Sequence, residues 1–240
     1  MSKHRIPEFL RKFGESNGVK DNNYYCYSDT DSVVGDTLIQ TSIGNIKIQD
    51  LYNVEGEETV LANDSYVKKP SSNITTYSVS EDLKLNDNNI KYIMKHKVKK
   101  RMFKIKTLEQ EVIVTEDHSI MVLRNNILTE VKPKDIIKGD KIIRLMHDVA
   151  TPLEYKSDFE IEDLGIQEIE VYDIEVENDH NFFGNDILVH NSCYFTLQPI
   201  SHVLYNPTDD NNTKADKIDD FIKTKIDPVI EENNKEFCDF

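Results

Sequence analysis

The sequence predicts a mostly β fold, flanked by short α+β segments, in a chain of 240 residues. Between residues 32 and 191, short apolar or alternating segments are separated by Gly, Asn and Asp, which is typical of strands joined by tight turns. In the same stretch one pattern occurs twice, at 44–51 and at 126–136, each time as a turn, a short strand and a small helical turn. We therefore expect one β domain with two related halves, a pseudo-twofold duplication.

The strands of the central domain are predicted at 37–41, 44–48, 103–107, 112–114, 120–122 and, after a turn, at 141–143. Residues 63–100 are rich in Asn, Ser, Lys and Asp with weak periodicity, so an irregular excursion with a short helix or hairpin is expected there. The basic run at 96–101 allows a contact with DNA, but a strand with a solvated cationic face is favoured in so acidic a chain.

The flanks of the central domain carry elements of both kinds. Apolar residues recur at helical spacing from Ile6 to Phe13, which predicts an amphipathic helix near the start of the chain. An aromatic strand is expected at 24–27. Beyond residue 192 we expect a strand at 193–197, a polar loop, and a helix with one apolar face over 218–230.

Composition excludes several classes of protein. A net charge of −15 argues against general nucleic-acid affinity of the whole chain, because phosphate binding requires a basic surface. The three cysteines are far apart and form no C-x-x-C, so neither a zinc site nor a disulfide framework is indicated. No apolar run is long enough for a signal peptide or a membrane span. We expect a cytoplasmic protein without a membrane partner.

Two junctions in the sequence carry the residues of self-cleavage. Asn191, which follows His190, can close its side-chain amide onto its own backbone carbonyl and so cleave the chain after itself. Ser32 and Ser192 each stand where a hydroxyl can attack the preceding carbonyl and convert an amide into an ester. Acyl transfer within one chain therefore needs no cofactor.

The motifs around these junctions resemble the splicing blocks of an intein. They are Ser32–Thr37, with Ser in place of the commoner Cys, Val114–His118 of the T-x-x-H form, Val171–Val176, His180–Phe183 and Asn185–Ser192. Any one motif alone is weak, but chance is a poor account of all of them in order with both junctions in place. The resemblance implies a mini-intein at 32–191, with 1–31 as the upstream extein and 192–240 as the downstream extein.

An intein-like chain implies the horseshoe-shaped Hint fold, in which the duplication brings both splice junctions into one cleft. Large inteins usually carry a homing endonuclease at the position of 147–165. That segment is short and acidic here, and it contains no LAGLIDADG-like helix and no H-N-H cluster. We expect no DNA-cleaving activity.

The resemblance also implies the residues of the first step. Ser32 attacks the Asp31 carbonyl, His118 protonates the departing nitrogen, and Thr115 hydrogen-bonds near the same amide to steady the oxyanion. Asp173 stands where inteins place a Cys or Asp that moves protons between the first and second steps.

The later steps involve the downstream junction. Ser192 attacks the ester to give a branched intermediate, and cyclisation of Asn191 then frees the intein. His190 and His180 supply the general acid and base for this closure. The ester that joins the exteins reverts to an amide without help.

Removal of 32–191 joins Tyr27–Asp31 to Ser192–Phe195, which gives a Y-x-D-T-D-S motif with an aromatic strand on each side. This resembles the palm motif of viral, phage-like family B DNA polymerases, in which Asp29 and Asp31 hold magnesium after splicing. No finger motif of the K-x-x-x-N-S-x-Y-G kind occurs, so we expect a polymerase fragment from a split gene or a truncated chain. Its implied partners are the remaining polymerase segments, and DNA and dNTPs only after splicing and assembly. A viral source implies the host-cell cytoplasm.

Two alternatives stay open. One is a Hint domain that cleaves without ligating, against which the intact Asn191-Ser192 pair argues. The other is a palm fragment of a split polymerase that carries an inert insert, and a shortened product distinguishes this from splicing.

The position of Asp31 beside the upstream junction generates a prediction. Once the ester at Ser32 has formed, the Asp31 carboxylate can attack its own activated carbonyl or assist water, and so compete with transfer to Ser192. We expect Ser192→Ala to release mostly a peptide ending in Asp31, and Asp31→Asn with Ser192→Ala to release measurably less. Mass spectrometry of the 1–31 peptide over time measures this, and equal release would show that the carboxylate plays no part.

Overall fold

The computed structural model describes residues 32–60, 65–147, 149–150 and 152–191, with residues 208, 210, 213, 217, 220, 223 and 224. The chain divides into two compact units, Asp29–Ser192 and Met1–Ser28 with Cys193–Phe240. The helix and strand predicted upstream, and the strand at 193–197, lie outside the described residues, as do all but three residues of the helix predicted at 218–230. In the described part of the chain, no helix has the length and apolar character needed to cross a membrane.

The described part of the chain is mostly β, as predicted. Its elements are β1 (Val33–Val34), β2 (Leu38–Thr41), β3 (Gly44–Lys47), α2 (Ile48–Leu51), β4 (Gly56–Val60), β5 (Tyr66–Pro70), β6 (Thr75–Val79), β7 (Leu85–Lys106), β8 (Glu111–Thr115), β9 (Ile120–Arg124), β10 (Ile127–Val131), η1 (Pro133–Asp135), β11 (Lys141–Leu145), β12 (Leu153–Lys156), β13 (Glu160–Val176), β14 (Asn181–Gly184) and β15 (Ile187–His190). The strands predicted from sequence are confirmed within one or two residues as β2, β3, the end of β7, β8, β9 and β11.

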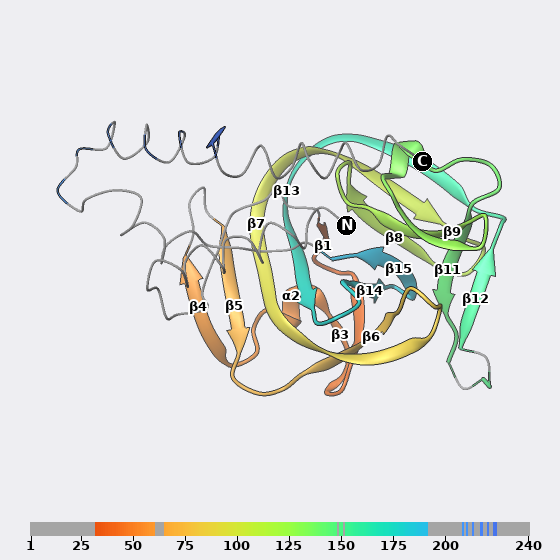
Figure 1. Cartoon of the computed structure of the whole chain (residues 1–240), viewed down its shortest axis with the longest axis horizontal. Coiled ribbons are helices and arrows are strands. Elements are labelled where there is room, and N and C mark those ends of the chain that lie inside the picture. The colour runs from red at the N-terminus through yellow and green to blue at the C-terminus, as the bar shows by residue number, and fades with distance from the viewer. Residues whose placement is uncertain are drawn as a thin grey trace. The chain divides into compact units, whose positions relative to one another are not determined.

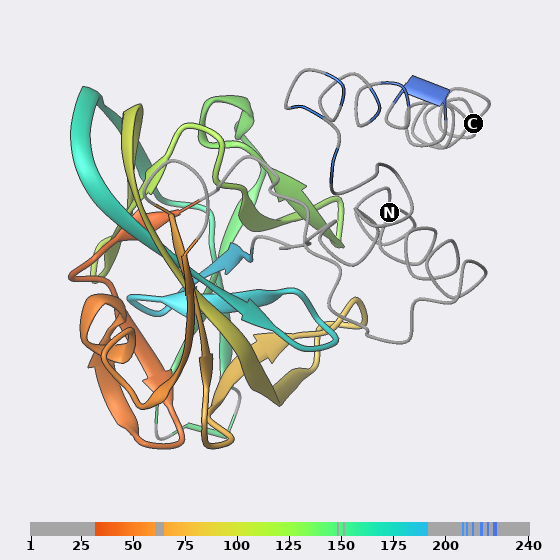
Figure 2. The ribbon, with the colours of Figure 1, turned by 90° about the vertical axis from the view of Figure 1, so that its left-hand side faces the viewer.

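Two long antiparallel strands, β7 and β13, organise the domain. They curve together around the other strands in Figure 1, and Figure 2 shows them crossing the domain side by side. Their register runs from Glu160 opposite Lys106 to Val176 opposite Ile90, with irregularities in two places. Opposite charges face each other along it, for example Glu168 with Lys99, and such cross-strand pairs favour this register.

The predicted duplication is confirmed at the level of the elements. The first copy forms the hairpin β2–β3 followed by α2, and the second forms the hairpin β9–β10 followed by η1. The β9–β10 hairpin turns through Asn125 and Asn126, whose φ angles are 52° and 64°. Asparagine tolerates this left-handed conformation, which suits a two-residue hairpin.

Of the expectation for 63–100, the hairpin is confirmed, as β6 and β7 pair antiparallel across a short turn, but the irregular excursion is wrong. Apart from residues 63 and 64, which lie outside the described residues, this segment forms β5, β6 and most of β7. The alternation is weak because β7 pairs in turn with β6, β5, β13 and β8, so that no single face of the strand is buried along its whole length. The buried face of β7 therefore changes along the strand, and its sequence shows no constant alternation of polar and apolar residues.

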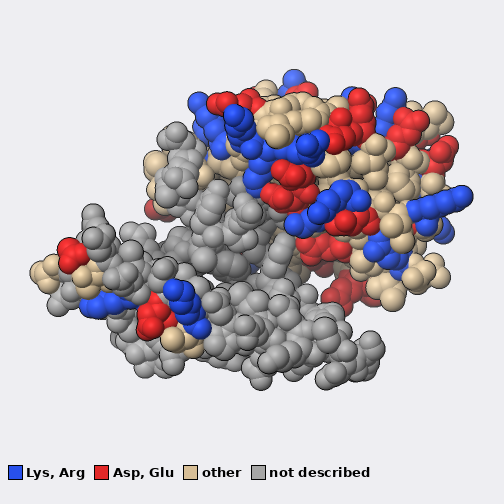
Figure 3. Space-filling view, turned by 90° about the horizontal axis from the view of Figure 1, so that it is seen from above, with Lys and Arg blue, Asp and Glu red and all other residues tan. Residues whose placement is uncertain are grey.

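The basic run at 96–101 lies in β7, as the favoured interpretation held. On the described part of the face in Figure 3, basic and acidic side chains are interspersed. Lys100 forms an ion pair with Asp117 at 2.5 Å, and the Arg101 carbonyl accepts a hydrogen bond from Glu116 N at 2.9 Å. The end of the run thus holds the turn that follows β8.

One hydrophobic core lies directly beside the predicted site residues. It includes Val33 of β1, Val114 of β8, Ile174 of β13 and Val189 of β15, all fully buried. Successive side chains of a strand point to opposite faces. Packing of these four side chains therefore fixes the direction of their neighbours in sequence.

An ion pair between the partly exposed Arg124 and the buried Asp140 joins the end of β9 to the start of β11. Arg124 donates from Nε and Nη2 to the two carboxylate oxygens of Asp140, each at 2.7 Å, and Ile137 N donates to the same carboxylate at 2.9 Å. Asp140 is 1% exposed. The hydrogen bonds from Arg124 outweigh desolvation and lower the pKa of the Asp140 carboxyl.

We predict that Asp140→Asn lowers the free energy of unfolding at pH 7 by about 2 kcal/mol, because Arg124 loses its charged partner. A lowered pKa contributes stability above the unfolded-state value, which is lost as pH falls through the folded-state value. The difference from the parent chain should therefore shrink below about pH 4. Urea denaturation, with Ser32 and Asn191 replaced by Ala to keep the chain intact, measures it. Asp87→Asn, at an exposed position of β7, is the control, and a pH-independent difference would contradict the prediction.

Candidate functional site

The upstream junction is held by β8. Thr115 N donates to the Ser32 carbonyl at 2.9 Å, and Ser32 N donates to Thr115 Oγ1 at 3.2 Å. Both residues are fully buried, and Ser32 Oγ has no hydrogen-bond partner among the described residues. The Thr115 hydroxyl thus lies at the nitrogen of the bond that was predicted to break.

The T-x-x-H turn continues from this contact. His118 N donates to the Thr115 carbonyl at 3.0 Å, which closes the turn. The His118 ring is fully buried and packs edge-on against Phe182 of β14, with ring centroids 6.5 Å apart. The imidazole is therefore held in place by packing and lies on the same turn as Thr115.

Asp173 reaches the upstream junction through β13. Val33 pairs with Tyr172, and continuing this antiparallel register by one residue puts Asp173 opposite Ser32. Asp173 is fully buried, and its Oδ1 accepts a hydrogen bond from Ile174 N at 2.8 Å. Burial, and then a hydrogen bond to Glu170, raise the pKa of the neighbouring Tyr172 hydroxyl, so that this phenol stays neutral.

The downstream junction is held by three backbone carbonyls. His190 N donates to Ser119 O at 2.9 Å, Asn191 N donates to His180 O at 3.0 Å, and Asn191 Nδ2 donates to Val176 O at 3.3 Å. Asn191 is fully buried. His180 has a φ of 51°, a left-handed conformation that precedes β14. The His180 carbonyl thus binds the backbone N–H of the junction residue.

The two ends of the domain both contact the turn Thr115–Ser119 and strand β13. The turn Thr115–Ser119 binds Ser32 at its first residue and His190 at its last. On β13, Asp173 lies opposite Ser32, and Val176 O, three residues later, accepts the Asn191 side chain. The structure therefore brings together seven of the predicted site residues: Ser32, Thr115, His118, Asp173, His180, His190 and Asn191.

The other predicted residues lie outside the described part of the chain. These are Ser192 and the proposed magnesium ligands Asp29 and Asp31. Within the described ranges, no group of three or more His, Cys, Asp or Glu side chains is arranged to hold a metal ion.

Three residues at the site were missed by the sequence analysis. Ser119 Oγ donates to Glu130 Oε1 at 2.9 Å, and Glu130 Oε2 lies 3.7 Å from His190 Nε2. Asn181 is 1% exposed and bonds both backbone groups of Val79, each at 2.7 Å. Ser119 directly follows the Val114–His118 motif and Asn181 lies within the His180–Phe183 motif, which was a usable signal. Glu130 has no such signal, because it lies in a hairpin between motifs.

The residues before β14 are fixed by the unexpected strands at 63–100. Asp179 Oδ2 accepts hydrogen bonds from Ser78 Oγ at 2.8 Å, Asn86 Nδ2 at 2.9 Å and Asn88 Nδ2 at 2.8 Å. Asp179 immediately precedes His180. The Asn-rich composition of the insertion therefore supplies donors that hold the loop leading into the downstream junction.

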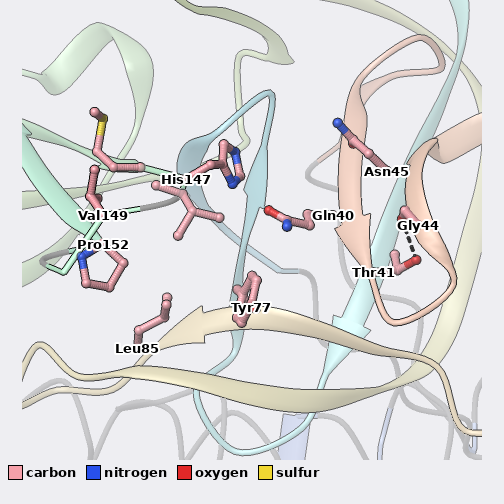
Figure 4. A pocket seen from close by; sticks show the side chains of 11 residues that line it. Gln40, Thr41, Gly44, Asn45, Tyr77, Leu85, His147, Val149 and Pro152 are labelled. Atoms are coloured by element: carbon pink, nitrogen blue, oxygen red, sulfur yellow. Dashed lines mark hydrogen bonds between the residues drawn. The ribbon is translucent and has the colours of Figure 1, made fainter.

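A hollow in the described part of the chain lies away from the site. Figure 4 shows it between the β2–β3 hairpin, Tyr77 and the segment around His147, with a volume of about 670 Å³. None of the predicted site residues lines it. An intramolecular reaction needs no substrate cavity, because both reacting groups belong to the chain.

A curved β domain with both of its ends on one turn has the architecture of the Hint type. The structure is similar to that of an intein from a hyperthermophile, with 22% identity, a TM-score of 0.59 and coverage of 67% of this chain and 99% of that chain. A DnaB intein from Synechocystis sp. PCC 6803 matches with 20% identity, a TM-score of 0.51 and coverage of 68% and 100%. At these identities the likeness shows the fold, and it confirms the predicted Hint-type architecture.

The family described as the intein splicing domain matches residues 37–191, well over half of the chain. The chain belongs to this family, and its activity is protein splicing.

One curated relative matches part of the chain. A DNA polymerase from Thermococcus aggregans is 39% identical over 107 residues, which are 44% of this chain and 6% of that protein. The chain thus spans a small part of the relative's length. The match is longer than the 31 upstream and 49 downstream flanking residues together, so it includes part of the domain itself.

The contacts of the turn generate a prediction. Thr115→Ala and His118→Ala should slow ester formation at Ser32 by on the order of 10² to 10⁴, the range for loss of general acid catalysis. Cleavage after Asn191 should persist, because Ser119 holds His190 through its backbone carbonyl. Hydroxylamine-induced cleavage at Ser32 and release of 192–240, followed by mass spectrometry, measure the two steps. Glu116→Gln on the same turn is the control, and equal slowing of both steps would mean that the turn serves only the fold.

Proposed function

We propose that residues 32–191 excise themselves and join Asp31 to Ser192. The observation that carries this proposal is the attachment of both domain ends to the turn Thr115–Ser119, through Ser32 and through His190. Splicing requires the two junctions to exchange an acyl group, so they have to lie together. Because one short turn binds both ends of the domain, the two junctions have little freedom to move apart.

In the proposed first step, Ser32 Oγ forms a bond to the Asp31 carbonyl carbon and the bond from that carbon to Ser32 N breaks. Thr115 Oγ1, at 3.2 Å from Ser32 N, orients the amide, and His118 delivers a proton to the departing nitrogen. Burial of the serine hydroxyl keeps water from competing for the acyl group. Asp173 takes up and returns protons as the site passes from the first step to the second.

In the proposed second phase, Ser192 Oγ takes the acyl group from Ser32. Asn191 Nδ2 then attacks its own carbonyl carbon and releases Ser192 N, with His190 and His180 as general acid and base. The Asn191 side chain is held at Val176 O, and its backbone N–H at His180 O, before the reaction. These bonds limit its rotation. The step uses acyl transfer within the chain.

We propose further that the product is the palm motif Y-x-D-T-D-S of a family B DNA polymerase of viral or phage-like origin. The polymerase relative and the sequence formed by joining Asp31 to Ser192 support this. Asp29 and Asp31 would hold magnesium in the spliced enzyme, where the metal supplies charge stabilisation for phosphoryl transfer. The partners are then the remaining polymerase segments, with DNA and dNTPs after assembly, in the cytoplasm of the host cell.

Intact-mass analysis of the expressed chain tests the splicing proposal directly. Splicing gives a free 32–191 fragment and a ligated product of 1–31 with 192–240. A domain that cleaves without ligating gives both flanks as separate peptides. An inert insert leaves one unchanged mass, which would overturn the proposal.

The role of Asn191 generates a prediction. Asn191→Ala removes the nucleophile of the last cleavage, so release of 192–240 should fall below detection while Ser32 still forms its ester. Branched species or hydroxylamine-sensitive cleavage at Ser32 should then accumulate, as denaturing gels and mass spectrometry would show. Asn45→Ala, at an exposed position of β3, is the matched control. Normal ligated product from Asn191→Ala would remove this residue from the mechanism.

A further inference from the structure

We infer that Glu130 is a positioning residue for His190 in the cleavage after Asn191. The inference rests on the proposed splicing function and adds a residue to it. The Glu130 carboxylate bridges the two segments that hold the downstream junction: Oε1 accepts a hydrogen bond from Ser119 Oγ at 2.9 Å, and Oε2 lies 3.7 Å from His190 Nε2.

The sheet places these three side chains on one face. Ile120 of β9 pairs with Val131 of β10 and with Val189 of β15. Each of these three paired residues has one of the site residues next to it in sequence: Ser119 precedes Ile120, Glu130 precedes Val131 and His190 follows Val189. Neighbouring side chains of a strand point to opposite faces, so Ser119, Glu130 and His190 share the face opposite that of the paired residues. The bond from His190 N to Ser119 O agrees with this register.

Glu130 is more exposed than His190, so a partly hydrated carboxylate acts on a largely buried imidazole. The His190 side chain is 12% exposed, whereas that of Glu130 is 38% exposed. The carboxylate therefore keeps part of its hydration, which lowers the cost of holding it charged. A hydrogen bond from Ser119, which is 3% exposed, fixes the other oxygen and limits the rotation of the side chain.

A carboxylate at Nε2 determines which protonation states His190 adopts. It favours a proton on Nε2, and the proton state of Nδ1 then sets whether the imidazole acts as acid or base. The buried position of Nδ1 keeps water away from that nitrogen. In triads of this logic the carboxylate holds the tautomer and orientation of the imidazole and does not itself take part in proton transfer.

The step that depends on this arrangement is the closure of Asn191. A bond forms between Asn191 Nδ2 and the Asn191 carbonyl carbon, and the bond from that carbon to Ser192 N breaks. One proton leaves Nδ2 and one reaches Ser192 N, so the closure needs an acid and a base but no other reactant. Glu130 acts on this exchange through His190.

The test uses the full chain with Ser32→Ala, which blocks the first step and leaves cleavage after Asn191 as the only reaction. Release of 192–240 is followed by mass spectrometry. Glu130→Gln keeps an acceptor for Ser119 but removes the charge, and we expect cleavage about tenfold slower, less than the loss of 10² or more that follows removal of a general acid or base. The midpoint of the pH–rate profile should move to lower pH, because the carboxylate no longer favours the protonated imidazole.

Two further variants separate positioning from folding. Ser119→Ala removes the hydrogen bond to Glu130 but keeps the charge, so its effect should be smaller than that of Glu130→Gln. In a His190→Ala background, Glu130→Gln should cause no additional loss, since it acts through His190. The step at Ser32, measured with Asn191→Ala in place of Ser32→Ala, should proceed at the parent rate in Glu130→Gln.

The outcomes distinguish the inference from the proposed function. If the parent chain gives neither spliced nor cleaved product, the splicing proposal fails and the role of Glu130 fails with it. If the Ser32→Ala chain cleaves after Asn191 at the same rate with Glu or Gln at position 130, the Glu130 assignment alone is overturned. An equal loss in the His190→Ala background, or a matching loss at Ser32, would also overturn it, by showing a role in folding.

Discussion

The structure depends on one constraint: the two ends of the domain, far apart in sequence, have to be held at one place. Hydrogen bonds from the turn Thr115–Ser119 to Ser32 and His190 meet this constraint. Strand β7 holds this turn in position through the ion pair of Lys100 with Asp117 and the hydrogen bond from Glu116 N to the Arg101 carbonyl. Strand β7 therefore supports the site without contributing a reacting group.

Burial is the second feature that follows from this arrangement. Ser32, Asp173 and Asn191 have no exposed surface, and each lies in or directly beside a strand whose core residues fix its direction. Burial keeps water away from these three side chains, which favours transfer over hydrolysis in a reaction without an external substrate. The same burial makes each polar contact costly to lose, because a buried donor or acceptor without its partner keeps its full desolvation penalty.

The Asn-rich insertion gains a physical role from its contacts. Its Ser and Asn side chains converge on Asp179, and Asn181 bonds the backbone of Val79, so the β6–β7 hairpin holds the residues on both sides of His180. A segment that looked irregular in composition is thus a support for the downstream junction. Polar residues at strand positions are stable here because their hydrogen bonds are made within the network.

The sequence by itself determined the mostly β class, the duplicated hairpin and helical turn, and the motifs that carry Ser32, Thr115, His118, Asp173, His180, His190 and Asn191. These features are local, since they depend on alternation, on turn residues and on residues adjacent in the chain. The strands at 63–100, the roles of Ser119 and Asn181, and the position of Glu130 beside His190 were decided by the tertiary structure. The side-chain contacts of these residues join partners 11 to 102 positions apart in the chain, such as Ser119 with Glu130 and Val79 with Asn181. Local periodicity does not indicate such pairings.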